Sequence, residues 1–264
     1  MSENLLYIRD EGTGRPVVLL HGWACPGRFL EGQIEALKAD ARCIVPDLPG
    51  HGNTGDRLPL TIEASADALH DYLCAQDLRE AVLCGWSMGA LVVYSLIERH
   101  GAERISCGVT IDMSPKVLND ADWPHGTSNG LTREINAVVL ETMVAEWPGL
   151  PARIARRLFA AGRPVDPALM AFARNEIAGG DPVLLRQMWA SLTEQDFRTL
   201  LRAFPVPLHL AAGAGSQLYS PAMIRWHRDN VPEIHVHEFA QSGHSPHLEE
   251  PQAFNRLLLD LLHG

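Results

Sequence analysis

The chain has 264 residues, enough to bury the core of one α/β domain with an insertion. Its 22 basic and 32 acidic residues give a formal net charge of −10, which argues against a nucleic acid or an anionic membrane surface as the main partner. The start of the chain lacks a basic segment followed by an apolar one, and no stretch is an apolar span of membrane length, so we expect a cytoplasmic protein.

Strands and helices alternate through the first half of the chain. Short apolar runs predict strands at residues 5–8, 16–20, 43–46, 81–84 and 106–111. Helical spacing predicts helices at 29–39, at 61–75 with Thr61 as the N-cap, and directly after residue 87. This alternation is typical of a mostly parallel sheet with helices on both faces, whose ligand site lies beyond the carboxyl ends of the strands.

The second strand ends in His21-Gly22-Trp23, and a loop rich in Gly and Pro follows the third. A glycine at the end of a buried strand lets the backbone approach a ligand, so the N–H of Trp23 is a candidate oxyanion donor. The loop contains Asp47 and His51. We expect both side chains to hydrogen-bond backbone at the turn rather than to act in catalysis.

A buried strand then runs into Gly85-Trp86-Ser87-Met88-Gly89, and a helical pattern begins at once. This Gly-x-Ser-x-Gly sequence between strand and helix is typical of a nucleophile elbow, in which the serine hydroxyl points away from the sheet edge. Small residues are needed at 85 and 89, where strand and helix pass closely. We therefore expect Ser87 to be a nucleophile and the N–H of Met88 to be the second oxyanion donor.

Helical patterns replace buried strands over residues 116–204. The helices are expected at 131–146, 151–160, 167–178, 182–192 and 196–203, several with a proline in the first turn. We predict a helical lid here, inserted into a core domain made of residues 1–115 and 205–264. Strands resume at 207–213 and 234–239, and the loop after the last strand contains His244.

Together these motifs resemble the α/β-hydrolase superfamily over essentially the whole chain. The matching segments, in the order of that superfamily, are His21-Gly22-Trp23, the loop 47–52, the serine motif 85–89 and the segment 242–251 around His244. The resemblance implies an α/β-hydrolase fold with a mostly parallel eight-stranded sheet and a helical lid after the sixth strand. The pair of His-Gly-Trp and Gly-Trp-Ser-Met-Gly is similar to bacterial carboxylesterases that demethylate pimeloyl-carrier-protein esters.

The acid of a catalytic triad departs from the pattern of most relatives. They carry it after the seventh strand in a Gly-x-x-Asp turn, whereas this turn reads Gly213-Ala214-Gly215-Ser216. A minority of the superfamily, including some haloalkane dehalogenases and the cofactor-free quinolone dioxygenases, carry the acid after the sixth strand, which here implies Asp112. The alternatives are Asp229, Glu238 or an apparatus of two residues without an acid.

A serine hydroxyl is a poor nucleophile at neutral pH, so Ser87 needs a base within hydrogen-bond reach. His244 would accept the Ser87 proton and return it to the leaving group. Asp112 would orient the His244 ring and stabilise its imidazolium. Four other histidines are expected to be structural, namely His209, His227, His235 and His237.

The predicted lid is rich in large apolar side chains. Helices this small need most of them for their own packing, but together they predict a pocket for an apolar acyl or aromatic group. The candidate substrate-binding residues are Trp86, Trp123, Met143, Trp147 and Trp189. Four arginines form a local basic face, for which a solvated helix surface is the favoured interpretation and a docking site for a phosphopantetheine carrier or coenzyme A the alternative. They are Arg153, Arg156, Arg157 and Arg163.

These patterns favour a serine hydrolase that cleaves a carboxylic ester, thioester or lactone through an acyl-enzyme. The expected substrate is a small molecule, free or linked to a carrier protein or coenzyme A. The alternative is a cofactor-free dioxygenase in which His244 and Asp112 deprotonate a heteroaromatic hydroxyl, and a perhydrolase activity of the same triad is a third reading. The five cysteines form no Cys-x-x-Cys pair, and the chain has neither metal-ligand spacing nor a dinucleotide motif, so we expect no cofactor and no metal.

Overall fold

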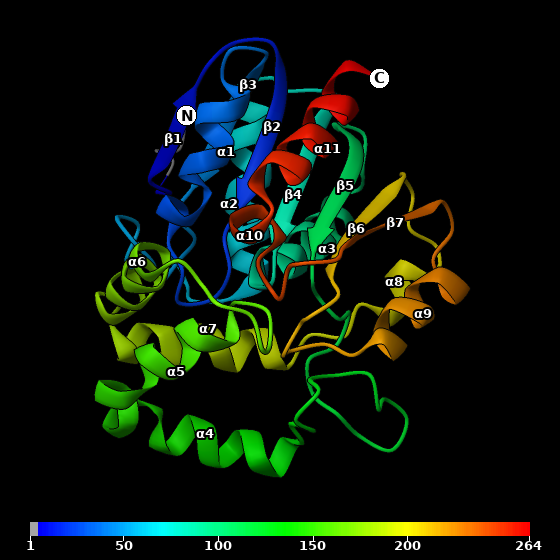
Figure 1. Ribbon diagram of the computed structural model, residues 1–264. Coiled ribbons are helices and arrows are strands. Elements are labelled where there is room, and N and C mark those ends of the chain that lie inside the picture. The colour runs from blue at the N-terminus through cyan, green and yellow to red at the C-terminus, as the bar shows by residue number, and fades with distance from the viewer. Residues whose placement is uncertain (1–4) are drawn as a thin grey trace.

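The computed structural model describes residues 5–264, which form one mostly parallel sheet covered by helices on both faces (Figure 1). Within that range the sheet has seven strands in the order β1-β3-β2-β4-β5-β6-β7. β1 pairs with β3 in the antiparallel sense, and every other pair is parallel. The strands are β1 (Ile8–Glu11), β2 (Arg15–Leu20), β3 (Ala41–Pro46), β4 (Ala81–Trp86), β5 (Ile105–Ile111), β6 (Leu208–Gly213) and β7 (Ile234–Phe239).

The sheet differs from the expectation at the edge formed by β1. The resemblance implies eight strands, but no eighth strand pairs with the sheet among residues 5–264. The first strand also lies later than the predicted range 5–8. The reason is that the backbone of Tyr7 bonds to the loop after β3: its N–H donates to Thr54 Oγ1, and its carbonyl accepts the N–H of Asp47, both at 2.9 Å.

Two apolar layers enclose the central strands, which are buried on both faces. Helices α2 and α3 pack on one face, and α1 and α11 on the other. Because β4 and β5 lie in the middle of this packing, the residues that follow them are held at fixed positions. The helices outside the insertion are a 3-10 helix at Gly27–Leu30, α1 (Glu31–Leu37), α2 (Ile62–Ala75), α3 (Met88–His100), α9 (Pro221–Asn230), α10 (Pro246–Glu249) and α11 (Pro251–His263).

Residues 116–204, called the helical insertion below, connect β5 to β6 through helices. They are α4 (Arg133–Glu146), a 3-10 helix at Trp147–Gly149, α5 (Leu150–Arg157), α6 (Pro167–Ala178), α7 (Pro182–Thr193) and α8 (Arg198–Leu201). The five predicted helices are confirmed, with ends that shift by up to three residues. Figure 1 shows α4 to α7 below the sheet, at the end toward which β4 and β5 point. None of the helices described in residues 5–264 is long and apolar enough to cross a membrane.

Candidate active site

Ser87 lies in a tight turn between β4 and α3. Its backbone has φ of 53° and ψ of −117°, a conformation that a serine rarely adopts. The turn requires glycines on both sides, because a Cβ on Gly85 would lie 2.4 Å from the carbonyl carbon of Gly89. The N–H of Ser87 donates to the carbonyl of Ile111 at 3.1 Å, which fixes the turn against the end of β5.

His244 and Asp112 form a buried pair at the same end of the sheet. His244 Nδ1 lies 2.7 Å from Asp112 Oδ2, and the two residues are 2% and 1% exposed. An ionised carboxylate only accepts hydrogen bonds, so Nδ1 carries the ring proton and Nε2 keeps its lone pair. Asp112 follows β5 directly with φ of 44°, and its N–H donates to Ala211 of β6 at 2.9 Å. The pair therefore leaves Nε2 of His244 as the candidate base.

The other candidate acids lie apart from His244. Glu238 is exposed and accepts a hydrogen bond from Arg228 at 2.6 Å, and Asp229 is exposed on α9. Asp112 is the one carboxylate in the described part of the chain that bonds to the His244 ring. Ser216, in the turn after β6, donates to Asp112 Oδ2 at 2.6 Å, a contact that sequence reasoning missed.

The loop of His244 is held by contacts that sequence reasoning also missed. Trp86 donates its indole N–H to the carbonyl of His244 at 2.8 Å. Glu249 accepts the N–H of Gly243 and that of Ala160 in the helical insertion, both at 2.7 Å. Burial raises the pKa of Glu249. The sequence signal that could have indicated this role of Glu249 is its position five residues after His244, in the segment that resembles the superfamily.

Gly22, the residue before Trp23, lies beside the nucleophile turn, because a Cβ on Gly22 would be 3.3 Å from Ser87 Cβ. His21 anchors this segment: its Nε2 accepts a backbone N–H of the loop after β3 at 2.8 Å, and its Nδ1 donates to the Gly22 carbonyl at 2.9 Å. Burial lowers the pKa of His21, so the ring stays neutral. Within residues 5–264, no hydrogen bond uses the N–H of Trp23 or Met88, which leaves both donors available.

The sequence model of the alpha/beta hydrolase family matches residues 17–257 of this chain. The chain belongs to this family. A pimeloyl-[acyl-carrier protein] methyl ester esterase from Aromatoleum aromaticum is 31% identical over an alignment that covers 94% of this chain and 98% of that protein. The enzyme of the same name from Chromobacterium violaceum is 29% identical, with 97% and 98% covered. An esterase from Exiguobacterium antarcticum shares the fold with a TM-score of 0.90 at 21% identity, over 98% of this chain and 96% of that one.

In this α/β hydrolase, three tryptophans pack around the loop after β2. The ring of Trp23 lies 4.8 Å from that of Trp189 and 6.3 Å from that of Trp147, measured between centroids. The indole of Trp23 donates to the carbonyl of Leu185 on α7 at 2.8 Å. We call Trp23, Trp147 and Trp189 the tryptophan cluster. Two of the predicted substrate-binding residues thus pack against the side chain of Trp23, and Met143 is buried in the same apolar layer.

Trp86 and Trp123 were also expected to contact substrate, but the structure places both in internal packing. Trp86 is 1% exposed, packs against Phe29 and uses its N–H on the carbonyl of His244. Trp123 is 2% exposed and packs edge-on against Trp226 of α9, with ring centroids 5.0 Å apart. A buried indole whose N–H is already paired has little surface left for a ligand.

The predicted hydrogen bonds of Asp47 and His51 to backbone are confirmed. Asp47 accepts the N–H of Gly27 at 2.9 Å through Oδ1 and that of Asn53 at 2.8 Å through Oδ2. His51 Nε2 accepts the N–H of Ala24 at 2.9 Å. Burial lowers the pKa of His51 to about 3, so its ring remains a neutral acceptor. Both side chains therefore fix loops around the site.

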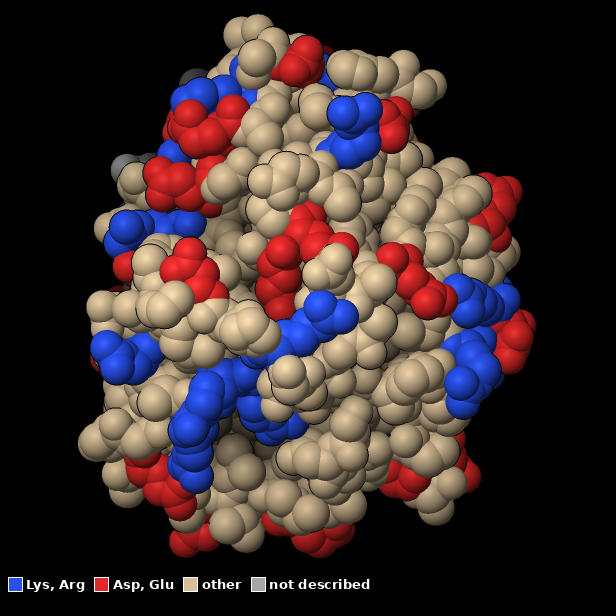
Figure 2. Space-filling model, in the orientation of Figure 1, with Lys and Arg blue, Asp and Glu red and all other residues tan. Residues whose placement is uncertain are grey.

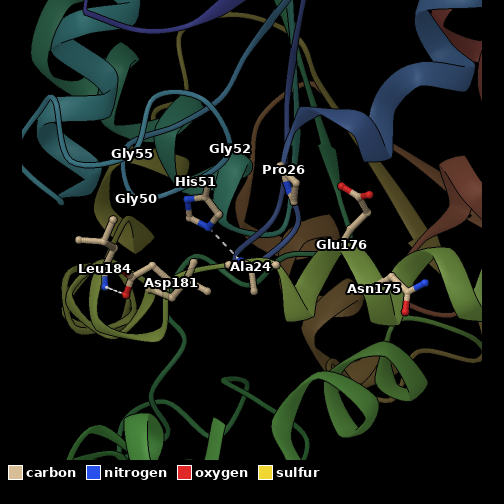
Figure 3. A pocket seen from close by; sticks show the side chains of 13 residues that line it. Ala24, Pro26, Gly50, His51, Gly52, Gly55, Asn175, Glu176, Asp181 and Leu184 are labelled. Atoms are coloured by element: carbon tan, nitrogen blue, oxygen red, sulfur yellow. Dashed lines mark hydrogen bonds between the residues drawn. The ribbon is translucent and has the colours of Figure 1, made fainter. Parts of the chain in front are cut away.

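A cavity of about 320 Å³ opens between the loop after β3 and helices α6 and α7. Figure 3 shows His51 pointing toward Ala24 at this cavity, and Glu176 projecting from α6. Its lining includes Leu185, whose carbonyl holds the indole of Trp23. The cavity thus adjoins the tryptophan cluster, while the three candidate catalytic side chains are not part of its lining.

Proposed function

We propose that this α/β hydrolase is a serine hydrolase that cleaves a carboxylic ester, thioester or lactone through an acyl-enzyme on Ser87. The observation that carries the proposal is the buried hydrogen bond of 2.7 Å between His244 Nδ1 and Asp112 Oδ2. It orients Nε2 as a base at the sheet edge where the strained turn presents Ser87. The relatives are named esterases, which supports ester hydrolysis as the reaction.

In the first half of this reaction, His244 Nε2 takes the proton of Ser87 as Oγ attacks the substrate's carbonyl carbon. The carbonyl oxygen becomes an oxyanion that accepts hydrogen bonds from the N–H groups of Trp23 and Met88. Loss of one such donor typically costs about 3 kcal/mol of transition-state stabilisation. The imidazolium, stabilised by Asp112, then protonates the leaving alcohol or thiol. Water repeats the same steps on the acyl-enzyme and releases the acid.

The proposed pocket for the acyl group lies under the helical insertion, which acts as a lid on a core made of residues 1–115 and 205–264. Trp147 and Trp189 supply an apolar wall beside Trp23. Glu249 joins this lid to the loop of His244 through its bond to the N–H of Ala160. Binding an apolar chain here would exclude water from the oxyanion donors and strengthen their hydrogen bonds.

We further propose an ester of a carrier-protein-linked acyl chain as the substrate, because two relatives are named for such a substrate. Figure 2 shows Lys and Arg side chains gathered in a band below the centre of this face, beside a hollow. On a protein with net charge −10, such a band attracts an anionic phosphopantetheine arm or an acidic carrier. The side chains proposed to contact the carrier are Arg153, Arg156 and Arg157 of α5 and Arg163.

The proposal is tested with p-nitrophenyl esters of graded chain length and with a fluorophosphonate probe. We expect ester turnover and stoichiometric labelling of the wild type, both lost in Ser87→Ala. Absence of turnover with every activated ester, together with an unlabelled Ser87, overturns the proposal.

The carrier is tested by comparing a methyl ester on an acyl-carrier protein with the same methyl ester free in solution. Arg156→Glu should raise KM for the carrier-linked ester and leave KM for the free ester unchanged. Arg225→Glu, an exposed charge reversal on α9, should change KM for neither ester. Equal effects of the two variants would contradict a docking role for α5.

The pairing of Asp112 with His244 also favours a second candidate, the cofactor-free dioxygenase. In that reaction the pair deprotonates a heteroaromatic hydroxyl, and the N–H groups of Trp23 and Met88 donate to the resulting anion while dioxygen attacks. Ser87 is not required. A Ser87→Ala variant that consumes oxygen with a hydroxyquinolone would support this function, whereas complete dependence on Ser87 with release of an alcohol excludes it.

A further inference from the structure

We infer that Ser216 is a positioning residue for Asp112. The inference rests on the proposed function, because it concerns how the proposed base is held. Ser216 lies in the turn after β6, and Asp112 in the turn after the neighbouring parallel strand β5. Both turns lie at the carboxyl end of the sheet, where the loop of His244 also lies.

A chain of hydrogen bonds runs through the Ser216 hydroxyl. The N–H groups of Leu218 and Tyr219 each donate to Ser216 Oγ at 3.2 Å. Oγ donates to Asp112 Oδ2 at 2.6 Å, and the same oxygen accepts the Nδ1–H of His244 at 2.7 Å. Because the lone pairs of Oγ receive two amides, its proton is directed at the carboxylate. Ser216 therefore pins the one oxygen on which the orientation of His244 depends.

The hydroxyl also supplies charge-assisted stabilisation. Asp112 is 1% exposed, so its charge depends on protein donors rather than on water. If the hydroxyl is removed, the carboxylate retains only His244 on Oδ2 and becomes free to rotate away from the ring. Without the Ser216 hydrogen bond, the negative charge of Asp112 is less stabilised and attracts the proton on His244 more strongly. The imidazolium is then favoured over the neutral imidazole. Ser216→Ala should therefore lower kcat and move the acid limb of the pH profile to higher pH.

The experiment measures kcat, KM and the pH profile of kcat/KM on a p-nitrophenyl ester. We expect Ser216→Ala to lower kcat about tenfold with KM little changed, and Ser216→Thr, which keeps the hydroxyl, to stay within a few-fold of wild type. Ser106→Ala, which removes a hydroxyl bonded at the opposite end of β5, is the matched control and should leave kcat and the pH profile unchanged.

Thermal unfolding of each variant separates loss of activity from loss of fold. An unchanged kcat and pH profile in Ser216→Ala overturns the inference while the proposed function stands. If the wild type has no esterase activity, the proposed function fails by itself. The proton NMR signal of His244 Nδ1–H then decides the inference, because it should shift in Ser216→Ala but not in Ser106→Ala.

Discussion

The indole N–H of Trp86 donates to the carbonyl oxygen of His244 at 2.8 Å. Trp86 immediately precedes the candidate nucleophile, so a side chain at the end of β4 holds the loop that carries the candidate base. Both residues are buried, with exposures of 1% and 2%. This contact couples the position of His244 to that of Ser87 through the scaffold, without using either reacting side chain.

Trp86→Phe should therefore affect stability and activity together. The substitution keeps an aromatic ring but leaves the buried carbonyl of His244 without its donor, which costs about 1–3 kcal/mol in the free energy of unfolding. We expect kcat on a p-nitrophenyl ester to fall about tenfold, because the loop of His244 loses a fixed point. Urea unfolding and steady-state kinetics on the same preparation measure both effects.

Trp123→Phe is the matched control. It also removes an indole hydrogen bond, to the carbonyl of Lys116 at 2.9 Å, but in packing against α9. We expect a similar loss of stability with kcat/KM unchanged. A clear fall of kcat/KM in Trp123→Phe would instead indicate that Trp123 contacts the substrate, as the sequence predicted.

Asp112→Asn should remove most of the activity if Asp112 is the acid that orients the base. Asparagine can donate to His244 and stabilise the wrong tautomer, and the corresponding substitution in a serine protease triad lowers kcat about 10⁴-fold. Glu238→Gln, in which the pairing with Arg228 is weakened, should leave kcat unchanged. Activity on an activated ester across pH measures both, and a larger effect of Glu238→Gln would reverse the assignment.

The positions of Ser87, Asp112 and His244 could be predicted because local sequence patterns indicate the strands and where they end. Each follows an apolar run, and parallel strands bring their carboxyl ends to one edge. The absence of an acid in the turn Gly213–Ser216 could likewise be noticed. What Ser216 does instead could not, since its hydrogen bond to Asp112 joins residues 104 apart in the sequence.

The roles of Trp86 and Trp123 could not be predicted because a tryptophan in a core and one in a pocket have the same local signature. Which face an indole meets depends on tertiary packing, here against Phe29 and Trp226. The start of β1 was missed for a similar reason. The apolar residues before Ile8 suggested a strand, but the backbone of Tyr7 bonds to a loop that is distant in the sequence.

Gly243→Ala should disturb the packing between the loop of His244 and the helical insertion. A Cβ at this position would lie 2.4 Å from the backbone carbonyl carbon of Phe159, so one of two backbone segments must move. We expect a loss of about 1–3 kcal/mol in stability together with reduced kcat. Gly149→Ala is the control, because no heavy atom lies within 4 Å of the added methyl. Equal stability and kcat in the two variants would show that this packing tolerates displacement of the backbone.

Acid should destabilise the protein below about pH 6.5, because His227 is buried without charge. It is 0% exposed, its Nδ1 bonds to the carbonyl of Met223 at 3.0 Å, and burial lowers its pKa from 6.5 to about 4. As pH falls through 6.5, His227 binds a proton in the unfolded chain but not in the folded chain. The free energy of unfolding therefore decreases, by about 3 kcal/mol for this residue once the pH is below its folded pKa.

His227→Phe removes this proton uptake, so its unfolding free energy should change less than that of the wild type between about pH 7 and about pH 4. His263→Phe, an exposed change in the last helical turn, should keep the wild-type dependence. Urea unfolding at a series of pH values gives the slopes. Burial also lowers the pKa values of His51 and His247 to about 3, so the variant should retain part of the acid sensitivity. Identical slopes for wild type and His227→Phe would show that His227 takes up its proton without unfolding.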